Sequence, residues 1–424
     1  MLIELAYGRS GLSVDLPGEA TVIEPAYIPG LHDECLALQQ ALRNPVAGRP
    51  LRELVASRQR IAIAVCDITR PMPSARVLPL LLNEISHVPS DRIAILVATG
   101  THRGNTPAEL EAMLGREVTG RYSVINHDGR DEANLAFVGR TERGIPIWLN
   151  RRWMEADFRI TTGFIEPHFF AGFSGGPKMV APGLAGLETV MHLHGADLIA
   201  HPDSTWGITQ GNPIHDSIRE IARRTAVHFS VDITINRDHR ITGVYAGELF
   251  QAHAAGCLFA KETAMRPVPD PFHVVVTTNS GYPLDLNLYQ AVKGMSAAAR
   301  VVAQGGTIIC AAECSNGIPD HGEYGKILRS GRSPADLLAQ IQMPGYRRQD
   351  QWQVQVQAMI QQKARVLFKN SFLSTEQVRS AHLEPIDDVP KAVQDSLREH
   401  GAGSRLCVLP QGPMTIPYLR RLSA

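Results

Sequence analysis

The sequence predicts an α/β protein with two α/β domains, each built on a mostly parallel sheet. Apolar runs of strand length alternate with stretches long enough for helices. The segment 266–271 has three prolines in six residues and separates an earlier set of these runs from a later set. A chain of 424 residues is also long for a single domain. We therefore expect domains at residues 1–265 and 272–424.

The strands of each domain are expected where apolar residues follow one another without polar alternation. In the first domain these runs are 61–65, 93–97, 122–125 and 158–161. In the second domain they are 272–277, 307–312, 364–368 and 405–409. Runs that are apolar throughout are typical of strands covered by helices on both faces of a sheet. The glutamine-rich run near 351–362 is expected to form one face of an exposed helix.

Composition argues against several classes of function. The chain has 42 basic and 42 acidic residues, without a long run of either sign, which disfavours partners such as nucleic acid or a membrane surface. The N-terminus lacks an apolar signal core, and no segment approaches the roughly 20 apolar residues that span a bilayer. Six cysteines are expected to be reduced thiols. Together these features predict a cytoplasmic protein.

Two polar clusters directly follow predicted strands. Asp67, Thr69 and Arg70 come after the first run, and His102 comes after the second. In open α/β sheets ligands bind beyond the carboxyl ends of the strands, so these side chains are expected in one pocket. The alternative is turn chemistry, in which the aspartate and threonine cap helices and the arginine lies on the surface.

The segment 163–178 combines a histidine, a glycine-rich turn and a lysine. The amides of Gly175 and Gly176, with the Ser174 hydroxyl, are expected to surround a phosphate, and Lys178 follows at the place where that ligand is held. The segment is not a nucleotide-binding P-loop, because a proline precedes the lysine and a methionine follows it. A tight turn with a surface lysine is the competing interpretation.

The segment 187–194 is expected to be helical and carries His192 and His194. Two residues apart on a helix point to different faces, so at most one of them serves a given metal. A histidine on a largely apolar helix is also often a hydrogen-bonded structural residue. No zinc motif of the His-Glu-x-x-His or paired Cys-x-x-Cys type is present.

Taken together, the motifs spell out a family pattern between about residues 60 and 300. They are Asp-x-Thr-Arg-Pro at 67–71, Gly-Thr-His-Arg at 100–103, Ile-Glu-Pro-His-Phe-Phe-Ala-Gly-Phe-Ser-Gly-Gly-x-Lys at 165–178, Pro-Gly-x-Ala-Gly at 182–186 and Tyr-Gln-Ala-Val-Lys-Gly at 289–294. In order and spacing they resemble the nickel-dependent lactate racemase family. Their joint occurrence is much more specific than any one of them.

The resemblance implies a nickel-pincer nucleotide, a pyridinium mononucleotide whose two sulfur substituents and ring carbon hold nickel. By position, Lys178 matches the lysine that attaches this cofactor covalently, and His194 matches the protein ligand to nickel. Sulfur, carbon and one imidazole suit a planar four-coordinate nickel ion. The cofactor-lining segment corresponds to Asp67, Ile68, Thr69 and Arg70. The resemblance also implies cofactor-synthesis enzymes as partners.

The resemblance further implies a small-molecule 2-hydroxy acid as substrate and a racemase or epimerase activity. His102 and His168 match the acid/base pair. The substrate contacts correspond to Arg70, Tyr289, Gln290, Lys293 and Trp352. The Cα–H bond of a 2-hydroxy acid is not acidic enough for a histidine to remove it as a proton. Loss of hydride to the cofactor avoids this difficulty and yields a planar 2-keto acid that can take the hydride back on either face.

The distribution of these motifs makes a prediction about domain function. The cofactor residues fall in the first domain, whereas Gln290 and Lys293 share a face of a helix expected at 285–300 in the second. The active site is therefore expected in the inter-domain cleft, whose closure would exclude water. A carrier or sensor that binds a nucleotide or the cofactor without catalysis is the alternative. The sequence does not distinguish lactate from other 2-hydroxy acids.

Overall fold

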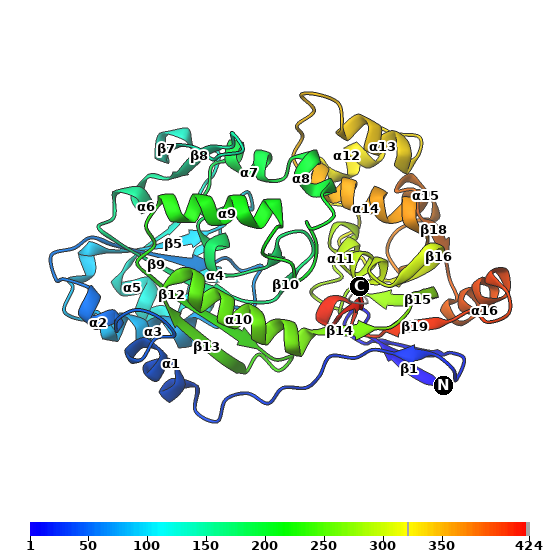
Figure 1. Cartoon of the computed structure of the whole chain (residues 1–424), viewed down its shortest axis with the longest axis horizontal. Helices are drawn as coiled ribbons and strands as arrows, with labels where there is room; N and C mark the ends of the chain where they lie inside the picture. Colours follow the sequence, from blue (N-terminus) through cyan, green and yellow to red (C-terminus); the bar gives the residue numbers. More distant parts are fainter. Residues whose placement is uncertain (320–321, 421–424) are drawn as a thin grey trace. The chain divides into compact units, whose positions relative to one another are not determined.

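The computed structural model describes residues 1–319 and 322–420, and it contains two compact α/β units (Figure 1). Unit N consists of Tyr27–His194 and His201–Lys261. Unit C consists of Met1–Ala26, Gly195–Ala200 and Glu262–Ala424. The α/β fold class and the two mostly parallel sheets are confirmed. The compact units differ from the expected domain ranges, because the first 26 residues group with the C-terminal part of the chain.

Unit N is built on a six-stranded sheet of order β13-β12-β9-β4-β5-β6. All neighbouring strands run parallel except β13, which pairs antiparallel with β12 at one edge. The bounds are β4 Ile61–Cys66, β5 Ile93–Ala98, β6 Ser123–Asn126, β9 Phe158–Phe164, β12 Phe229–Ile235 and β13 Ile241–Gly247. Every residue of β4 is buried, as expected for a central strand with both faces covered. The four strands predicted for this part of the chain are confirmed.

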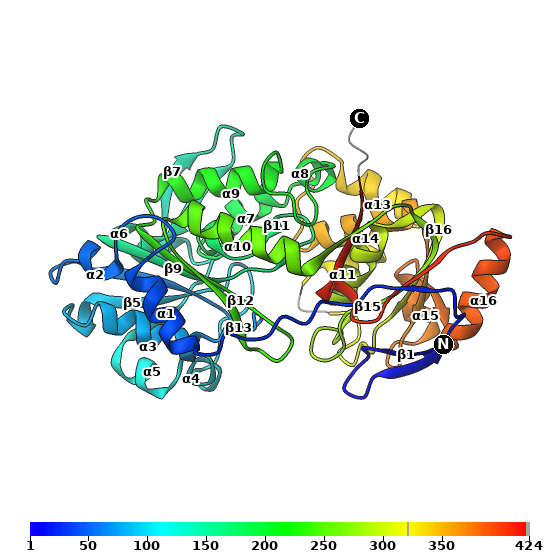
Figure 2. The ribbon, with the colours of Figure 1, turned by 60° about the horizontal axis from the view of Figure 1, so that its bottom comes forward.

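Helices cover both faces of the unit N sheet. Figure 2 shows α9 and α10 on one face and α1 and α3 on the other. The helices are α1 Glu34–Arg43, α2 Leu51–Leu54, α3 Ser74–Glu84, α4 Pro107–Leu114, α5 Arg116–Arg121, α6 Arg151–Glu155, α7 Leu187–Leu193, α9 Pro213–Arg224 and α10 Leu249–Ala264. Two small hairpins, β7 Leu135–Arg140 with β8 Pro146–Asn150 and β10 Pro167–His168 with β11 Gly172–Phe173, and the 3₁₀ helices η1 Ser90–Arg92, η2 Glu132–Asn134 and η3 Gly176–Met179 complete the unit.

Unit C has a six-stranded parallel sheet of order β18-β17-β16-β15-β19-β3. The strands are β3 Thr21–Val22, β15 Phe272–Thr278, β16 Val302–Ala311, β17 Arg365–Lys369, β18 Glu384–Ile386 and β19 Leu406–Leu409. A hairpin of β1 Leu2–Leu5 and β2 Leu12–Asp15 and a parallel pair of β14 Met265–Val268 and β20 Ile416–Leu419 lie outside this sheet. The strands predicted in the second half of the chain are confirmed.

The two faces of the unit C sheet have separate cores. Val275 packs with the helices on one face, whereas Val274 and Val276 pack with the β1–β2 hairpin and α16 on the other. This alternation follows from the period of two along a strand. The helices are α8 Ala196–Ala200, α11 Leu288–Ala299, α12 Tyr324–Leu328, α13 Pro334–Ile341, α14 Gln351–Lys363, α15 Thr375–Ser380 and α16 Val389–His400, with the 3₁₀ helix η4 Gly412–Met414.

Two local expectations are corrected in unit C. The helix expected from residue 285 begins at Leu288, because Asn287 is its N-cap and Asp285 accepts backbone hydrogen bonds from Gly8 and Glu313 instead. The glutamine-rich run is not an exposed face. The glutamines at 351, 353, 355 and 357 are all buried in α14. The side-chain NH₂ groups of Gln353, Gln355 and Gln357 donate to backbone carbonyls of other segments of unit C. The Oε1 atoms of Gln353 and Gln355 are buried without a partner among the described residues.

The structure also describes the cysteines and the length and polarity of the helices. All six cysteines are free thiols, and only Cys35 is exposed. Within the described ranges 1–319 and 322–420, no helix is both long and apolar enough to cross a membrane.

Candidate active site

The polar clusters of unit N meet at the carboxyl edge of its sheet. Asp67 follows the last residue of β4, Thr99 follows β5, and Ile165 follows β9. In the strand order, β5 and β6 lie on one side of β4, and the later strands β9 and β12 lie on the other side. The strand order therefore reverses at β4. Such a switch point is where open α/β sheets bind ligands.

Asp67 and His102 form a hydrogen-bonded pair at this edge. Asp67 Oδ2 lies 2.7 Å from His102 Nδ1, and Asp67 Oδ1 accepts from the Thr69 hydroxyl and amide at 2.6 and 3.2 Å. Burial alone raises the pKa of the Asp67 carboxyl, but the hydrogen bonds from His102 and Thr69 and the charge of Arg70 outweigh burial and hold this pKa below its usual value. An ionised carboxylate only accepts, so His102 Nδ1 carries a proton and Nε2 is the basic nitrogen of the neutral ring.

Further contacts join three of the motifs. Ile68 donates its backbone amide to the Asn105 side chain at 3.2 Å, which ties the turn after β4 to the segment after β5. Arg70 pairs with Glu166 at 3.7 Å, which ties the same turn to the glycine-rich segment. The side chain of Ile68 itself is 43% exposed, so this residue does not belong to the core.

The glycine-rich segment folds as a tight loop over β9 and β12. Gly175 and Gly176 have φ of +73° and +49°, a region that favours glycine. Gly176 donates its amide at 2.8 Å to Asp232, a fully buried carboxylate on β12. A Cβ on Gly163 would lie 2.1 Å from the same carboxylate, so the strand beneath the loop also requires glycine.

Ser174 holds this loop together. Its hydroxyl donates to Phe164 O at 2.7 Å and accepts from the Glu166 amide at 3.0 Å. Its carbonyl accepts from His253 Nε2 on α10 at 2.9 Å. The Ser174 hydroxyl and the Gly176 amide therefore bond protein groups, and their assignment as phosphate contacts stays a prediction.

One aromatic ring, that of Phe170, connects His168 with His194. Phe170 packs edge-on against His168 with ring centroids 4.6 Å apart and against His194 at 5.1 Å. Both imidazoles are 8% exposed. His168 Nδ1 accepts from the Ala171 amide at 3.3 Å, so the neutral His168 ring carries its proton on Nε2.

His194 has the properties of a metal-binding imidazole. It caps the C-terminus of α7, and its Nδ1 donates to Val190 O at 2.7 Å. A metal-ligating histidine usually donates its other nitrogen in this way, which directs Nε2 to the metal. Burial lowers the pKa of His194 to about 4, so the ring is neutral at pH 7. The hydrogen bond to Val190 opposes this shift, and the charge of Lys178 adds to it. His192 instead bonds Glu188 O at 2.8 Å and is only partly buried, as its opposite helical face predicts.

Lys178 lies in η3 directly after the glycine-rich turn and is partly exposed. Its charge lowers the pKa of His194, which places its amine and that imidazole in the same electrostatic environment. In the described part of the chain, no group of three or more histidine, cysteine, aspartate or glutamate side chains is arranged to hold a metal ion.

The remaining predicted residues belong to unit C. Gln290 and Lys293 lie in the first two turns of α11, three residues apart and partly exposed. Tyr289 precedes them, and its hydroxyl accepts from Trp352 Nε1 on α14 at 3.1 Å. Trp352 is therefore linked to this cluster, although the sequence around it offers little alignment.

Sequence reasoning missed two residues that support the site. Asp232 and His253 are both buried, and they hold the amide of Gly176 and the carbonyl of Ser174. Burial raises the pKa of Asp232 and lowers that of His253. A charged residue in the middle of an apolar strand such as β12 was the one available signal, because buried aspartates need specific partners.

Comparisons with known proteins cover nearly the whole chain. A family model described as the lactate racemase N-terminal domain matches residues 7–207, and one described as the lactate racemase C-terminal domain matches residues 269–416. A lactate racemase of Thermoanaerobacterium thermosaccharolyticum is 34% identical over 422 residues, which are 98% of this chain and 98% of that protein. A lactate racemase of Lactiplantibacillus plantarum is 34% identical over 417 residues, 97% of this chain and 98% of that protein.

Solved structures agree with these relatives. The lactate racemase apoprotein of Thermoanaerobacterium thermosaccharolyticum superposes with a TM-score of 0.93 and 33% identity, covering 99% of this chain and 100% of that chain. A protein from Thermotoga maritima has a TM-score of 0.69 and 21% identity over 93% of this chain and 100% of that chain, a likeness that concerns the fold alone.

Proposed function

Because this chain belongs to the lactate racemase family, we propose that it is an isomerase that interconverts the enantiomers of lactate or a related 2-hydroxy acid. The reaction passes through a 2-keto acid. The observation that carries the proposal is the buried Asp67 carboxylate bonded to His102, which gives this imidazole one defined basic nitrogen beside the ligand-binding edge of the sheet.

The cofactor proposed for this site is a nickel-pincer nucleotide. When bound, it accepts the hydride from the substrate Cα and returns it. Lys178 is proposed to carry the cofactor covalently, and His194 is proposed to ligate nickel through Nε2. The donor set fits, since His194 is neutral at pH 7 and its ring is oriented by Val190. Asp67, Ile68, Thr69 and Arg70, with the turn at 174–176, are proposed to line the nucleotide.

His102 is proposed to accept the hydroxyl proton of one enantiomer. Its Nε2 is the acceptor because Nδ1–H is bound to Asp67, and the imidazolium that forms is stabilised by that carboxylate. An imidazole is suited to this exchange since its unperturbed pKa lies near neutrality.

His168 is proposed to exchange a proton with the other enantiomer. In the present arrangement its Nε2–H is a donor toward a substrate oxygen. To act as a base it must move its proton to Nδ1, which breaks the contact with the Ala171 amide. That contact is buried and 3.3 Å long, and its loss leaves the Ala171 amide without this acceptor, so the change of tautomer costs about 1–3 kcal/mol.

Gln290, Lys293 and Arg70 are proposed to bind the substrate carboxylate and hydroxyl, with Tyr289 and Trp352 beside them. Positions three apart on α11 place Gln290 and Lys293 on one helical face, so one carboxylate can reach both. The hydrogen bond between Trp352 and Tyr289 fixes both rings.

The first test is the mass of the peptide that contains Lys178, from protein produced together with the cofactor-synthesis enzymes. A nickel-bearing nucleotide adduct on Lys178, absent from Lys178→Ala, is expected. Racemisation of a panel of single-enantiomer 2-hydroxy acids then identifies the substrate. Loaded protein that racemises no member of the panel would favour a carrier or sensor, and an unmodified Lys178 under these conditions would refute the cofactor assignment.

A further inference from the structure

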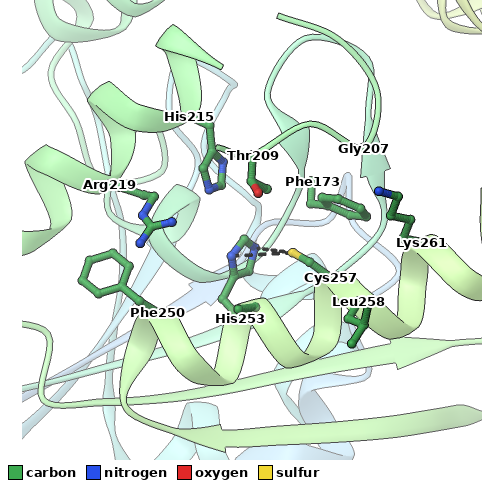
Figure 3. Close-up of a pocket in the computed structure, with 11 residues that line it drawn as sticks. Phe173, Gly207, Thr209, His215, Arg219, Phe250, His253, Cys257, Leu258 and Lys261 are labelled. Carbon is green, nitrogen blue, oxygen red and sulfur yellow. Dashed lines mark hydrogen bonds between the residues drawn. The ribbon is translucent and has the colours of Figure 1, made fainter. Parts of the chain in front are cut away.

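A cavity of about 220 Å³ lies in unit N between α9 and α10 (Figure 3). It is smaller than the roughly 300–1,000 Å³ typical of sites for drug-sized ligands, which suits a small molecule. None of the residues that the motifs assign to the cofactor or substrate lines it. The residues that matter for its chemistry are Arg219, Lys261, His215, His253, Cys257 and Thr209.

The cavity is positively charged. Arg219 and Lys261 line it, and the described residues of its wall include no aspartate or glutamate. Arg219 Nε is buried and has no hydrogen-bond partner in the described part of the chain, and its guanidinium contacts the Phe250 ring at 5.1 Å. By contrast, Arg224 on the same helix is neutralised by Glu220 at 2.7 Å. Guanidinium and ammonium groups that line a concave site favour an anionic ligand.

The two cations lie at opposite ends of the cavity. Arg219 packs against Phe250 at the start of α10, and Lys261 comes eleven residues later on the same helix, a rise of about 16 Å at 1.5 Å per residue. Figure 3 shows His253 and Cys257 between them. The wall between the charges also includes Phe173 and Leu258, whose side chain is 61% exposed. The arrangement is therefore cationic at each end and partly apolar along its length.

A metal ion is the competing occupant, because two histidines and a cysteine line the middle of the cavity. Their geometry opposes it. His215 Nδ1 is bonded to Ala171 O at 3.1 Å and His253 Nε2 to Ser174 O at 2.9 Å. The rings stack at 5.7 Å, nearly parallel, and do not converge on one point. Burial raises the energy of any added positive charge here and lowers the pKa of both imidazoles, and at His253 this effect outweighs the opposing charge of Asp232.

We propose that this cavity binds a small linear dianion, with one anionic group at Arg219, the other at Lys261 and an apolar chain along Phe173 and Leu258. Thr209 adds a hydroxyl donor to the wall. The ligand class is an α,ω-dicarboxylate or an acid phosphorylated at its other end, and both share this spacing of charges. The site is distinct from the proposed racemase site and does not depend on its cofactor.

The test is calorimetric titration of the full-length protein with glutarate, adipate and suberate, each compared with the monocarboxylate of equal length. Phosphorylated acids of similar length form a second arm. The dianions are expected to bind about 2–5-fold more tightly than the monoanions, because the second anionic group pairs with Lys261, which is exposed to solvent. Arg219→Gln should weaken dianion binding about 10–100-fold. Lys261→Gln should weaken it about 2–5-fold and remove the preference over monoanions.

Matched controls separate this site from general charge effects. Arg121→Gln and Arg237→Gln remove arginines of unit N that pack on a tyrosine ring, as Arg219 packs on a phenylalanine ring, and they should leave binding unchanged. Arg70→Gln should also leave it unchanged. The proposal is overturned if no dianion binds saturably, if Arg70→Gln abolishes binding while Arg219→Gln does not, or if the cavity takes up Zn²⁺ and no dianion. Thermal unfolding of each variant verifies that it is folded.

Discussion

Replacing Asp67 with asparagine tests the role assigned to the Asp67–His102 pair. Oδ1 of Asp67 accepts two hydrogen bonds from Thr69, and Oδ2 faces His102 Nδ1. Asparagine has a single oxygen, which is expected at the Oδ1 position because there it keeps both Thr69 donors. Its NH₂ group then faces His102 and can only donate, so neutral His102 must accept at Nδ1 and hold its proton on Nε2. The basic nitrogen is thereby lost.

The size of the effect follows from the alternatives open to the amide. Turning it to restore the His102 bond leaves the Thr69 amide without this acceptor. Because Thr69 is exposed, the loss is that of an ordinary hydrogen bond, about 0.5–1.5 kcal/mol, so the reactive tautomer is reduced roughly 2–12-fold. Loss of the carboxylate also removes a charge-assisted bond to the imidazolium, worth about 1.5–3 kcal/mol. Together these losses predict a fall in kcat of roughly 30–2,000-fold, less than the roughly 10⁴-fold that follows loss of the orienting carboxylate from a catalytic triad.

Two assays read out this change. The first is ¹⁵N NMR of the cofactor-free protein, in which the His102 signal, identified by its absence from His102→Gln, should change from the Nδ1–H to the Nε2–H tautomer. The second is single-turnover formation of 2-keto acid in the loaded enzyme, which should slow for one enantiomer only. Steady-state kcat/KM cannot show this asymmetry, because the equilibrium constant between enantiomers is 1 and both directions fall together.

The reasoning would be refuted by an Asp67→Asn protein that retains the Nδ1–H tautomer or full racemase activity. An equal fraction of Lys178 carrying the adduct in wild type and variant verifies that cofactor loading is unchanged. The carboxylate also affects stability. Since its folded pKa is depressed, its contribution is present above the unfolded pKa and lost as pH falls through the folded value. The difference in unfolding free energy between the two proteins should therefore shrink in acid.

The remaining predictions concern stability, measured as the free energy of unfolding in urea. Gln357→Leu removes the acceptor of the buried Tyr324 hydroxyl and leaves Ala381 O with only the 3.5 Å bond from Gln361, so it should cost about 1–3 kcal/mol. Gln362→Leu on the exposed side of the same helix should stay within about 0.5 kcal/mol, and equal effects would mean that the buried amide is dispensable. Gly172→Ala and Gly144→Ala impose the same backbone strain, because both glycines have φ +78°. At Gly172 the new Cβ would also lie 2.1 Å from a carbonyl oxygen, whereas at Gly144 it would meet no atom within 4 Å. Gly172→Ala should therefore lower the free energy of unfolding more, and a similar loss in both variants would refute the role of this close approach. Burial places the pKa of His215 at about 3, so from about pH 6.5 downward the unfolded chain takes up a proton that the native chain does not, and stability should fall with pH; His215→Gln should reduce this slope, and an unchanged slope would contradict the assignment.

Much of the fold was predictable because buried strands have a local sequence pattern, a continuous run of apolar residues. The apolar runs at 61–65 and 272–277 identify buried strands without knowledge of their neighbours, since a strand covered on both faces needs apolar residues at every position. The expected exposure of the glutamine-rich run was wrong because burial of polar side chains depends on their partners in the fold. A pattern of polar residues reports an average preference for water, and it cannot show that α14 meets backbone carbonyls for its glutamines to bond.

The candidate site divides in the same way. The sequence by itself determined which polar residues follow β4, β5 and β9, because strand ends are local features. Only the tertiary structure decided that Asp67 bonds His102, 35 residues away, and that Asp232 lies beneath Gly176. It alone also brought α9 beside α10 and left Arg219 Nε without a hydrogen-bond partner in the described part of the chain. These contacts depend on the order of strands in the sheet and on the packing of helices across it, and a hydrogen bond acts only over about 3 Å, a separation that no spacing along the chain specifies.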